Sequence, residues 1–506
     1  MPDVTDPESG LLIGNPEAPV LDQSDLPDIS ALATAVGAMI LSASGWRAVF
    51  AADGLEESPT ADVSPPLLVA AALAAEVFAD YLLRTIATPT LAVGLDTRPT
   101  GPLIARAAIR TLLGRGIEVH YLFVSASPEI MAYAGETSGV DGFLYVSASH
   151  NPVGHNGLKM GIGFGVLGGD DSRTLIQAFR EAASDPQRVG AALKTLTGPA
   201  PAETRILAGC SGHKKRALAN YLRFTDAIAR GPGPGADTMM TALESTLKER
   251  RPGIVADLNG SARTLSIDHT VLTGLGCRFR VINDTPGVIA HQIVPEGAGL
   301  APCAEELMRL VISNDGDFFL GYVPDNDGDS GNLVFYDAPA GTVRQLEAQE
   351  VFALCCVSEF SWLVSSGAIS YDESGKTTKP VAVVVNGPTS MRIDRIAGMF
   401  GIEVHRAEVG EANVVSRARE LRQSDYVVRI LGEGSNGGNI TYPGSVRDPI
   451  QTVLSVLKLL YTPATRTTPA PLAEWAARRG GMDTNDSLAG VIRSLPVYTT
   501  TSAFED

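Results

Sequence analysis

Residues 143–152 read FLYVSASHNP, and the rest of the chain is organised around this stretch. Its first four residues are apolar and predict the end of a buried strand. A loop rich in small and hydroxyl side chains follows, and open α/β proteins place their chemistry in loops at strand ends. Pro152 fixes one backbone angle, and the flanking glycines let the main chain approach a charged group. Lys159 adds a cation beyond Ser149, so the stretch predicts a site for a charged ligand.

Serine, histidine, lysine and free backbone N–H groups together suit a phosphate better than an acyl group. From the local pattern alone, a plain polar turn is an equally good interpretation. A serine hydrolase built on Ser149 and His150 is disfavoured, because adjacent residues do not readily form such a pair. The chain also lacks the Gly-x-Ser-x-Gly motif of that class.

Composition narrows the class of protein. The chain has 506 residues, too many for one hydrophobic core, so three or four domains are expected. Its formal net charge of −17 disfavours nucleic acid and membrane as partners, although a local basic cleft for an anionic metabolite stays open. Five cysteines without CxxC spacing predict reduced, mostly buried thiols, a cytoplasmic setting and no zinc site.

Two stretches of the first hundred residues were checked for targeting or membrane segments, and neither has the pattern of one. Residues 1–28 are acidic and Pro-rich without a signal-peptide pattern, and we expect them to form a tail. The apolar stretch 65–79 is too short for a membrane span and predicts a buried helix.

Strand and helix patterns alternate along the chain and start afresh three times. We therefore expect an α/β protein with three similar α/β domains, whose mixed, mostly parallel sheets surround a central cleft. The expected units are a tail at 1–28, domain 1 at 29–200 with the Ser149 loop, domain 2 at 201–340, domain 3 at 341–460, and at 461–506 a linker with the truncated lead-in to a missing further domain. In domain 1, Asp96 and Arg98 are expected to pair and brace a loop.

A second informative loop covers residues 324–332, which read PDNDGDSGN. In an extended loop alternate side chains point the same way, so the carboxylates of Asp325, Asp327 and Asp329 can converge on one Mg²⁺. Without a cation they would repel one another. A calcium-binding EF-hand is disfavoured because strands, not helices, are expected on both sides. An acidic turn is the alternative.

A third loop, residues 432–439, reads GEGSNGGN after another apolar run. The side chains of Glu433 and Ser435, with Asn436 beside them, suit vicinal sugar hydroxyls, because a carboxylate accepts two hydrogen bonds. On the pattern alone, a structural turn is the stronger interpretation.

These loops resemble the α-D-phosphohexomutases, the phosphoglucomutase and phosphomannomutase family. Ser-Ala-Ser-His-Asn-Pro followed by Asn-Gly-Leu-Lys, within residues 147–159, is similar to the family's phosphoserine loop. The acidic loop resembles its Asp-x-Asp-Gly-Asp metal site, and Gly-Glu-x-Ser at 432–435 its sugar-binding loop. Ser-Gly-Trp-Arg at 44–47 resembles a further family loop whose arginine, here Arg47, approaches the substrate; an ordinary turn is the alternative.

The resemblance implies a phosphohexomutase that interconverts hexose 1-phosphate and hexose 6-phosphate through a phosphoserine and a bisphosphosugar. Mg²⁺ is the implied cofactor, and the implied partners are hexose phosphate and hexose bisphosphate, with the chain a monomer or small homo-oligomer. The implied roles are catalysis for Ser149, His150, Lys159 and Arg47, metal binding for Ser149, Asp325, Asp327 and Asp329, and substrate binding for Glu433, Ser435 and Asn436.

The chain departs from the family pattern at several places. Ser330 stands where the family has an arginine after the third aspartate, and Gly437 and Glu411 stand where it often has histidines. The Arg-x-Ser-x-Thr phosphate loop of the family's fourth domain is not found, and we expect that domain to be lacking. These departures keep an alternative open: a non-catalytic relative that binds sugar phosphates or regulates.

Overall fold

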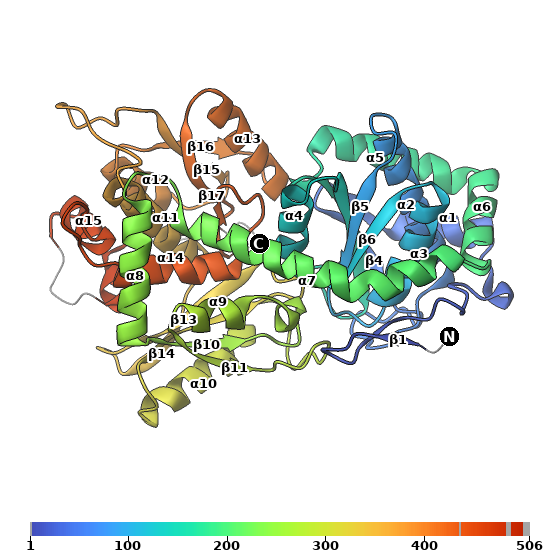
Figure 1. Ribbon diagram of the computed structural model, residues 1–506, viewed down its shortest axis with the longest axis horizontal. Helices are drawn as coiled ribbons and strands as arrows, with labels where there is room; N and C mark the ends of the chain where they lie inside the picture. The colour runs from blue at the N-terminus through green and yellow to red at the C-terminus, as the bar shows by residue number, and fades with distance from the viewer. Residues whose placement is uncertain (1–2, 435–436, 482–486, 499–506) are drawn as a thin grey trace, which may run out of the picture.

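The computed structural model describes residues 3–434, 437–481 and 487–498. The fold contains three mixed sheets with surrounding helices (Figure 1). The strand orders are β3-β4-β8-β7-β5-β6 with β9 beside β8, then β11-β10-β12-β13-β14, and then β16-β15-β17-β18. In each sheet three strands pair in parallel and antiparallel strands continue from the third of them. The expected α/β class with mixed sheets is confirmed, with the parallel pairing confined to those three strands.

The first sheet lies in the amino-terminal half, the blue and teal part of Figure 1. Its strands are β3 (Ile40–Ser42), β4 (Gly45–Val49), β5 (Thr90–Leu95), β6 (Glu118–Val124), β7 (Gly142–Val146), β8 (His155–Ile162) and β9 (Gly165–Val166). Its helices are α1 (Ile29–Ala38), α2 (Pro65–Leu83), α3 (Gly101–Gly114), α4 (Ser127–Glu136), α5 (Gly169–Ser184) and α6 (Pro186–Thr197). We call this part the first unit.

The helix α2 is the centre of the first hydrophobic core. It is 19 residues long and apolar enough to cross a membrane by composition, so the apolar stretch extends further than residues 65–79. However, 72% of its apolar window is buried against the rest of the protein. A core helix passes the same test of length and composition, and the burial identifies α2 as one.

The amino-terminal segment packs onto the first unit, which corrects the expectation of a tail. It contains β1 (Val4–Thr5), β2 (Leu12–Gly14) and a 3₁₀ turn at Gln23–Asp25. Ile13 and Val20 are buried, and the carbonyl of Ala18 accepts hydrogen bonds from Arg106 and Arg110 at 2.8 Å each. A few apolar side chains and backbone carbonyls anchor the segment despite its acidic, Pro-rich composition.

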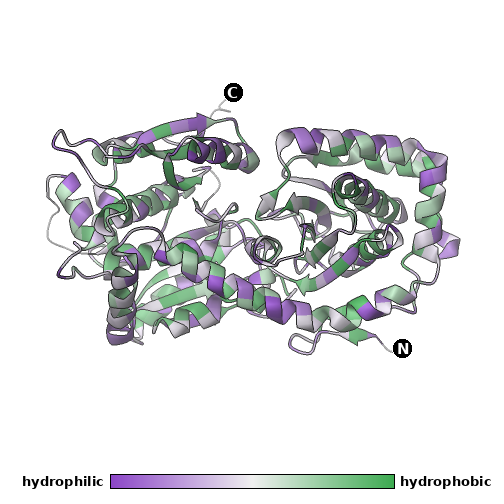
Figure 2. Ribbon diagram, turned by 45° about the horizontal axis from the view of Figure 1, so that its top comes forward, coloured by the Kyte–Doolittle hydropathy of each residue, from purple (hydrophilic) through white to green (hydrophobic). Residues whose placement is uncertain are grey.

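A 30-residue helix, α7 (Pro201–Arg230), connects the first unit to the others and crosses the middle of Figure 1. Pro201 suits its first turn, and Gly231, with φ of +64°, ends it. Hydrophobic and hydrophilic residues alternate along α7 in Figure 2, as expected of a helix with one buried face. The boundary expected at residue 200 thus coincides with the start of one continuous helix.

The second sheet follows the helix α8 (Ala236–Arg250). Its strands are β10 (Gly253–Asp257), β11 (Arg278–Ile282), β12 (Phe318–Pro324), β13 (Gly331–Asp337) and β14 (Thr342–Gln345). Its helical segments are α9 (Asp268–Gly274) and α10 (Ala301–Ile312), with 3₁₀ turns at Ala262–Leu265 and Gly297–Leu300. This part is the second unit.

The third sheet and the carboxy-terminal helices form the third unit. Its strands are β15 (Val381–Asn386), β16 (Glu403–Ala407), β17 (Val427–Gly432) and β18 (Ile440–Thr441). Its helices are α11 (Ala348–Ser365), α12 (Arg392–Met399), α13 (Glu411–Gln423), α14 (Pro449–Tyr461), α15 (Pro471–Arg478) and α16 (Leu488–Ser494).

The segment 461–506, expected to be a linker and the truncated lead-in to a fourth domain, contains two helices, α15 and α16, among the residues that the structure describes. Trp475 of α15 is fully buried, and its ring stacks on Phe400 with centroids 6.3 Å apart. A Thr/Pro-rich stretch therefore precedes a helix that belongs to the core of the third unit.

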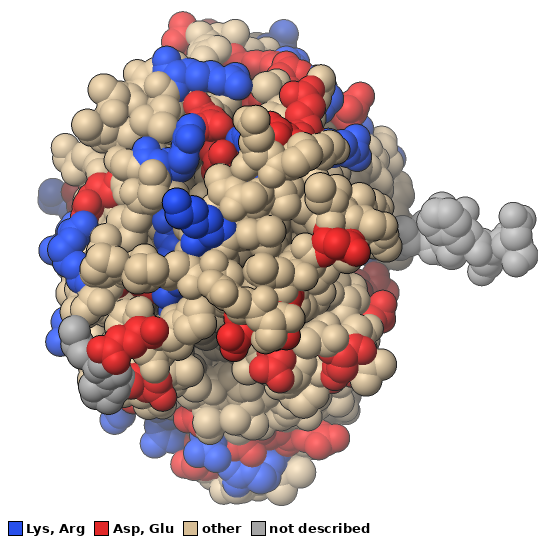
Figure 3. Space-filling view, turned by 90° about the vertical axis from the view of Figure 1, so that its right-hand side faces the viewer, with Lys and Arg blue, Asp and Glu red and all other residues tan. Residues whose placement is uncertain are grey.

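Charges of both signs are interspersed on the face of the molecule that Figure 3 shows. Lys and Arg lie close to Asp and Glu over much of this face, with large uncharged areas between them. The net negative charge of the chain is therefore not gathered into one acidic patch on this side.

Candidate functional site

The Ser149 loop and the acidic loop meet in the fold. Ser149 Oγ donates a hydrogen bond of 2.7 Å to Asp325 Oδ2, although the two residues are 176 positions apart. Both side chains are buried. The contact joins the first unit to the second and makes this junction the candidate site.

The three informative loops occupy equivalent positions in the three sheets. Each follows the third strand of the parallel part, β7, β12 or β17, and leads into an antiparallel strand. The carboxyl ends of parallel strands are where open α/β sheets bind ligands. Because the topology repeats, each unit presents one of the three loops at the same edge of its sheet.

Ser149 has an unusual backbone. Its φ is +55°, in the left-handed region that costs energy for residues other than glycine. The hydroxyl of Ser147 accepts a hydrogen bond of 2.8 Å from the backbone N–H of Ser149. Strain of this kind persists where the surroundings enforce it, and it is common at functional sites.

Arg98 supports the Ser149 loop through hydrogen bonds to its backbone, as expected of the Asp96–Arg98 pair. Arg98 Nε lies 3.1 Å from Asp96 Oδ2. Arg98 Nη2 donates to the carbonyls of Ser149 at 2.8 Å and Asn151 at 2.6 Å. Both charged side chains are buried, so the pair fixes the loop rather than meeting solvent.

The acidic loop gathers three carboxylates. Oxygens of Asp325, Asp327 and Asp329 lie within 4.8 Å of one another, and all three residues are buried. One of these oxygens, Asp327 Oδ1, has no hydrogen-bond partner in the part of the chain that the structure describes. A buried carboxylate oxygen without a partner is costly, and hard oxygen donors at this spacing suit a divalent cation such as Mg²⁺.

Two cations face the carboxylates. Lys159 Nζ donates to Asp327 Oδ2 and, at 3.2 Å, to Asp329 Oδ2. Lys159 lies on β8, opposite Tyr145 of β7, and not in the loop. Arg447 Nη2 lies 3.4 Å from Asp329 Oδ1.

This arrangement shifts the pKa values of the groups in opposite directions. Burial, and then the neighbouring Asp327 and Asp329, raise the pKa of Asp325. Burial would raise the pKa of Asp329 too, but Lys159 and Arg447 outweigh it and lower that pKa. Burial would lower the pKa of Lys159, but the carboxylates outweigh it and raise that pKa. A cation added among the carboxylates would relieve the repulsion that Asp325 experiences.

Arg447 is a site residue that sequence analysis missed. Ser330 donates to Asp329 Oδ1 at 3.0 Å. Arg447 approaches the same oxygen from the third unit, and its Nε pairs with Glu411 Oε2 at 2.9 Å. The sequence indicated only that a helix begins nearby, and nothing in it relates residue 447 to residue 329.

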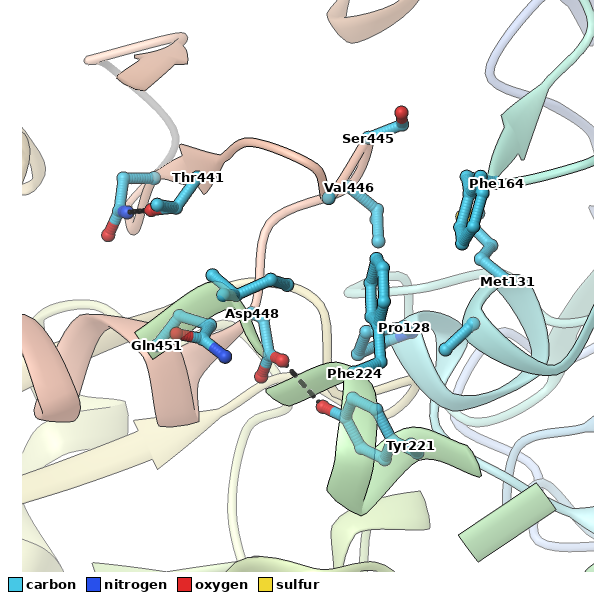
Figure 4. Close-up of a pocket in the computed structure, with 14 residues that line it drawn as sticks. Pro128, Met131, Phe164, Tyr221, Phe224, Thr441, Ser445, Val446, Asp448 and Gln451 are labelled. Atoms are coloured by element: carbon cyan, nitrogen blue, oxygen red, sulfur yellow. Dashed lines mark hydrogen bonds between the residues drawn. The ribbon is translucent and has the colours of Figure 1, made fainter. Parts of the chain in front are cut away.

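Asp448, which follows Arg447 in the chain, lies in a buried joint between α7, the second unit and the third unit (Figure 4). Tyr221 of α7 donates to Asp448 Oδ2 at 2.6 Å, and Arg263 Nη1 donates to Asp448 Oδ1 at 3.1 Å. Figure 4 shows Tyr221 pointing at Asp448 beside the ring of Phe224. The cavity there is only about 10 Å³, so the joint is closely packed.

Arg47 and His150 are the other two residues for which a catalytic role was expected. Arg47 lies on β4 opposite Gly157, donates to the Ser44 carbonyl at 3.4 Å, and keeps a buried Nε without a partner among the described residues. His150 is exposed and lines a cavity of about 460 Å³ together with His291 of the second unit. No hydrogen bond joins His150 to Ser149 or the carboxylates within the described chain.

The third loop is only partly described. Glu433 is buried and accepts hydrogen bonds from Asn386 Nδ2 at 2.8 Å and from the Gly410 N–H at 2.7 Å. The other two predicted residues, Ser435 and Asn436, lie outside the described residues.

Comparison with protein families finds two matches. The description of phosphoglucomutase/phosphomannomutase α/β/α domain I matches residues 47–186, and that of α/β/α domain III matches residues 365–479. Together the two matched ranges cover half of the chain. They contain the Ser149 loop and the Glu433 loop.

Curated relatives include phosphoglucosamine mutases. That of Lactococcus lactis subsp. cremoris is 26% identical over 276 residues, which are 54% of this chain and 56% of the relative. That of Streptococcus pneumoniae is 28% identical over 291 residues, 57% of this chain and 55% of the relative. The chain thus spans about half the length of the curated relatives it matches.

Solved structures share the fold. A phosphoglucomutase/phosphomannomutase family protein from Burkholderia thailandensis has a TM-score of 0.58 at 16% identity, covering 92% of this chain and 81% of that one. The phosphoglucomutase pp63/parafusin from Paramecium has a TM-score of 0.53 at 16% identity, covering 86% and 74%.

Proposed function

Because this chain belongs to the phosphoglucomutase/phosphomannomutase family of α-D-phosphohexomutases, we propose that it interconverts hexose 1-phosphate and hexose 6-phosphate. The observation that carries the proposal is the hydrogen bond of 2.7 Å between Ser149 Oγ and Asp325 Oδ2. It joins the hydroxyl proposed to carry the phosphoryl group to the carboxylates proposed to hold a metal.

In the proposed reaction, phosphorylated Ser149 gives its phosphoryl group to a hydroxyl of a hexose phosphate. The bond from phosphorus to Ser149 Oγ breaks, a bond to the sugar oxygen forms, and the hydroxyl proton ends on Ser149 Oγ. The hexose bisphosphate turns over and returns its other phosphoryl group to Ser149 by the reverse steps. Most of the rate enhancement in such a transfer comes from positioning and electrostatics.

Asp325, Asp327 and Asp329, with Ser149, would hold Mg²⁺. The close oxygens of the triad and the unpartnered Asp327 Oδ1 support this assignment. When bound, the ion offsets negative charge on the transferring oxygens. Lys159 then serves as a fixed cation on β8 beside the same carboxylates, and Arg47 as a second cation on the neighbouring strand.

We propose that Arg447 replaces the family's arginine at Ser330. Its guanidinium lies 3.4 Å from Asp329 Oδ1, where the short Ser330 side chain leaves room for it. The positive charge beside the substrate would then come from the third unit. Arg447 also pairs with Glu411, which stands at one of the positions where the family often has a histidine.

Glu433, with Ser435 and Asn436, is proposed to bind sugar hydroxyls at the edge of the third sheet. The names of the relatives point to hexose phosphates with glucose, mannose or glucosamine as the sugar. Each sheet with its helices would form one domain, α15 and α16 included in the third. The five buried, free cysteines fit a reducing compartment such as the cytoplasm.

Incubation of the full chain with glucose 1,6-bisphosphate and Mg²⁺ tests the proposal. Mass spectrometry should find one added phosphoryl group on the peptide that contains Ser149. Assays with the 1-phosphates of glucose, mannose and glucosamine should then reveal turnover for at least one. Binding of these sugars with no phosphate on Ser149 and no turnover would favour the non-catalytic relative, to which the serine at position 330 also points.

A further inference from the structure

The first unit holds an apolar cavity of about 340 Å³ that the proposed reaction does not use. Leu95 and Val124, the last residues of the parallel strands β5 and β6, line it. Leu12 of the amino-terminal segment and Leu103 of α3 are among the other wall residues. The cavity therefore lies at the sheet edge where open α/β folds bind small molecules. Its volume is at the small end of the range of about 300–1,000 Å³ for ligand sites.

One wall of this cavity carries a positive charge that its buried neighbours balance only in part. Arg106, which lines the cavity, and Arg110 share one carboxylate, that of Glu203, with contacts of 2.6 and 2.7 Å. All three residues are buried, so two cations face one anion. Within the described chain, Arg106 Nη1 makes no hydrogen bond. The Asp96–Arg98 pair on another wall is neutral as a pair.

The backbone at the cavity is strained. Phe123, which lines the cavity, has a φ of +58°, and the pairing of β5 with β6 shifts register between Val93 and Gly94. A bulky residue in the left-handed region is a genuine outlier. Such outliers are concentrated at ligand sites, where the surrounding structure enforces them.

We infer that this cavity binds a compact apolar carboxylate. The leucine, valine and phenylalanine walls take the hydrocarbon body, and Arg106 takes the carboxylate. A buried excess cation favours an anion, and a guanidinium binds a carboxylate in a directional way. A neutral analogue of the same shape lacks this contact and binds more weakly.

Occupancy of the cavity bears on the candidate active site through residues 97 and 98, which also line it. Thr97 Oγ1 donates to Asn326 Oδ1 of the acidic loop at 2.9 Å. Arg98 donates to the carbonyl of Ser149 at 2.8 Å. A ligand that packs on this segment stabilises the arrangement in which the two loops meet, and the cavity is thus a regulatory site.

Calorimetry with the full chain tests binding and needs no mutase activity. The probe is 4-phenylbutanoate, and its amide is the neutral analogue. The acid is expected to bind at least tenfold more tightly than the amide. In the Ala61→Trp variant a bulky ring at the exposed rim blocks the cavity, and affinity for the acid falls at least tenfold. Ala52→Trp, at an exposed position that does not line the cavity, should bind like the wild type.

Arg106→Gln removes the positive charge of the cavity wall without blocking the cavity. In this variant Glu203 keeps Arg110, and the preference for the acid over the amide should disappear. No binding of the acid by the wild-type chain, unchanged affinity in Ala61→Trp, or equal affinities of acid and amide for the wild type would overturn the proposal.

Hydrogen exchange tests the regulatory step. With the probe at saturation, amides of residues 147–155 should exchange at least twofold more slowly in the wild type and at an unchanged rate in Ala61→Trp. Unchanged exchange in the wild type at saturation would overturn the regulatory part of the inference.

Discussion

Two buried charge clusters of this protein differ in how completely they are satisfied. In the third unit, Glu359 accepts hydrogen bonds from Arg429 Nε at 2.8 Å, Lys458 Nζ at 2.7 Å and Ser455 Oγ at 3.2 Å. Both of its oxygens are therefore occupied. At the junction of the units, three aspartates crowd together and Asp327 Oδ1 is left without a partner in the described chain.

We interpret the Glu359 cluster as a structural cluster and the aspartate cluster, the proposed metal site, as the functional cluster. Glu359 joins α11 to β17 and α14, and both the carboxylate oxygens and the guanidinium of Arg429 have hydrogen-bond partners there. The aspartates are arranged for something other than the stability of the empty fold, because like charges in a buried site raise its energy. The two clusters can be compared by making the same kind of substitution in each.

The largest effect is expected from Ser149→Ala. Removal of the hydroxyl should lower mutase turnover by about 10⁴-fold or more, because no group is left to carry the phosphoryl. Turnover with a hexose 1-phosphate measures it, and thermal unfolding should stay near that of the wild type. Ser313→Ala, at the exposed end of α10, is the matched control. Substantial turnover in Ser149→Ala would refute the role of Ser149.

The isosteric pair Glu359→Gln and Asp327→Asn addresses the comparison most directly. Glu359→Gln leaves two buried cations without a carboxylate and should cost about 3–5 kcal/mol of unfolding free energy. Asp327→Asn removes one of three crowded charges, and without metal it should change that free energy by less than about 1 kcal/mol. Urea denaturation in the presence of a chelator measures both. Equal losses in the two variants would show that the clusters do not differ in kind.

Acid should weaken the structural cluster through Glu359. Burial would raise its pKa, but Lys458 and Arg429 outweigh burial and lower the pKa from 4.5 to about 2. Below pH 4.5 the unfolded chain binds the proton first, so this stabilisation is lost as the pH falls toward 2. The stability gap between wild type and Glu359→Gln should shrink by about 3 kcal/mol over that range. A gap that stays constant with pH would contradict the lowered pKa.

Metal should stabilise the functional cluster alone. At a Mg²⁺ concentration of about 100 times Kd, the wild type should gain about 2–3 kcal/mol of unfolding free energy. Asp325→Asn should lose most of that gain, and Glu359→Gln should retain it. Thermal unfolding with Mg²⁺ and with chelator measures the effect. A full gain in Asp325→Asn would place the ion elsewhere.

The smallest effect concerns Arg447. Arg447→Gln should lower kcat/KM about tenfold, which corresponds to about 1.4 kcal/mol. Adding Ser330→Arg to that variant should restore part of the loss, because it returns a cation to the same carboxylate. Failure of the second substitution to restore any activity would argue against the proposed replacement.

Local patterns predicted the strands and the loops that follow them. The apolar runs before Ser149, Asp325 and Glu433 proved to be β7, β12 and β17, since short runs of branched and aromatic side chains are typical of buried strands. The pairing of Asp96 with Arg98 could also be predicted, because the two residues are close in sequence.

Long-range contacts could not be predicted in this way. The approach of Arg447 to Asp329 depends on how the third unit docks, and no local pattern encodes it. The helices α4, α8, α10 and α15 were not predicted, although α8 and α10 bury residues at helical spacing: Met239, Leu243 and Leu247 in α8, and Cys303, Leu307 and Leu310 in α10. Lys159 was predicted only as a cation beyond Ser149, and it is the pairing with β4 and β7 that places it on the strand β8.

The helix α7 acts as a strut between the units. It is about 45 Å long at 1.5 Å per residue, and Trp362 and Arg429 of the third unit hydrogen-bond to carbonyls of its last turns, those of Arg230 and Ile228. Its other end packs on the first sheet. A strut fixed at both ends resists stretching, so we expect the units to separate by pivoting about its axis. Distance measurements between spin labels on the first and third units would show whether substrate changes the angle while the span along α7 stays constant.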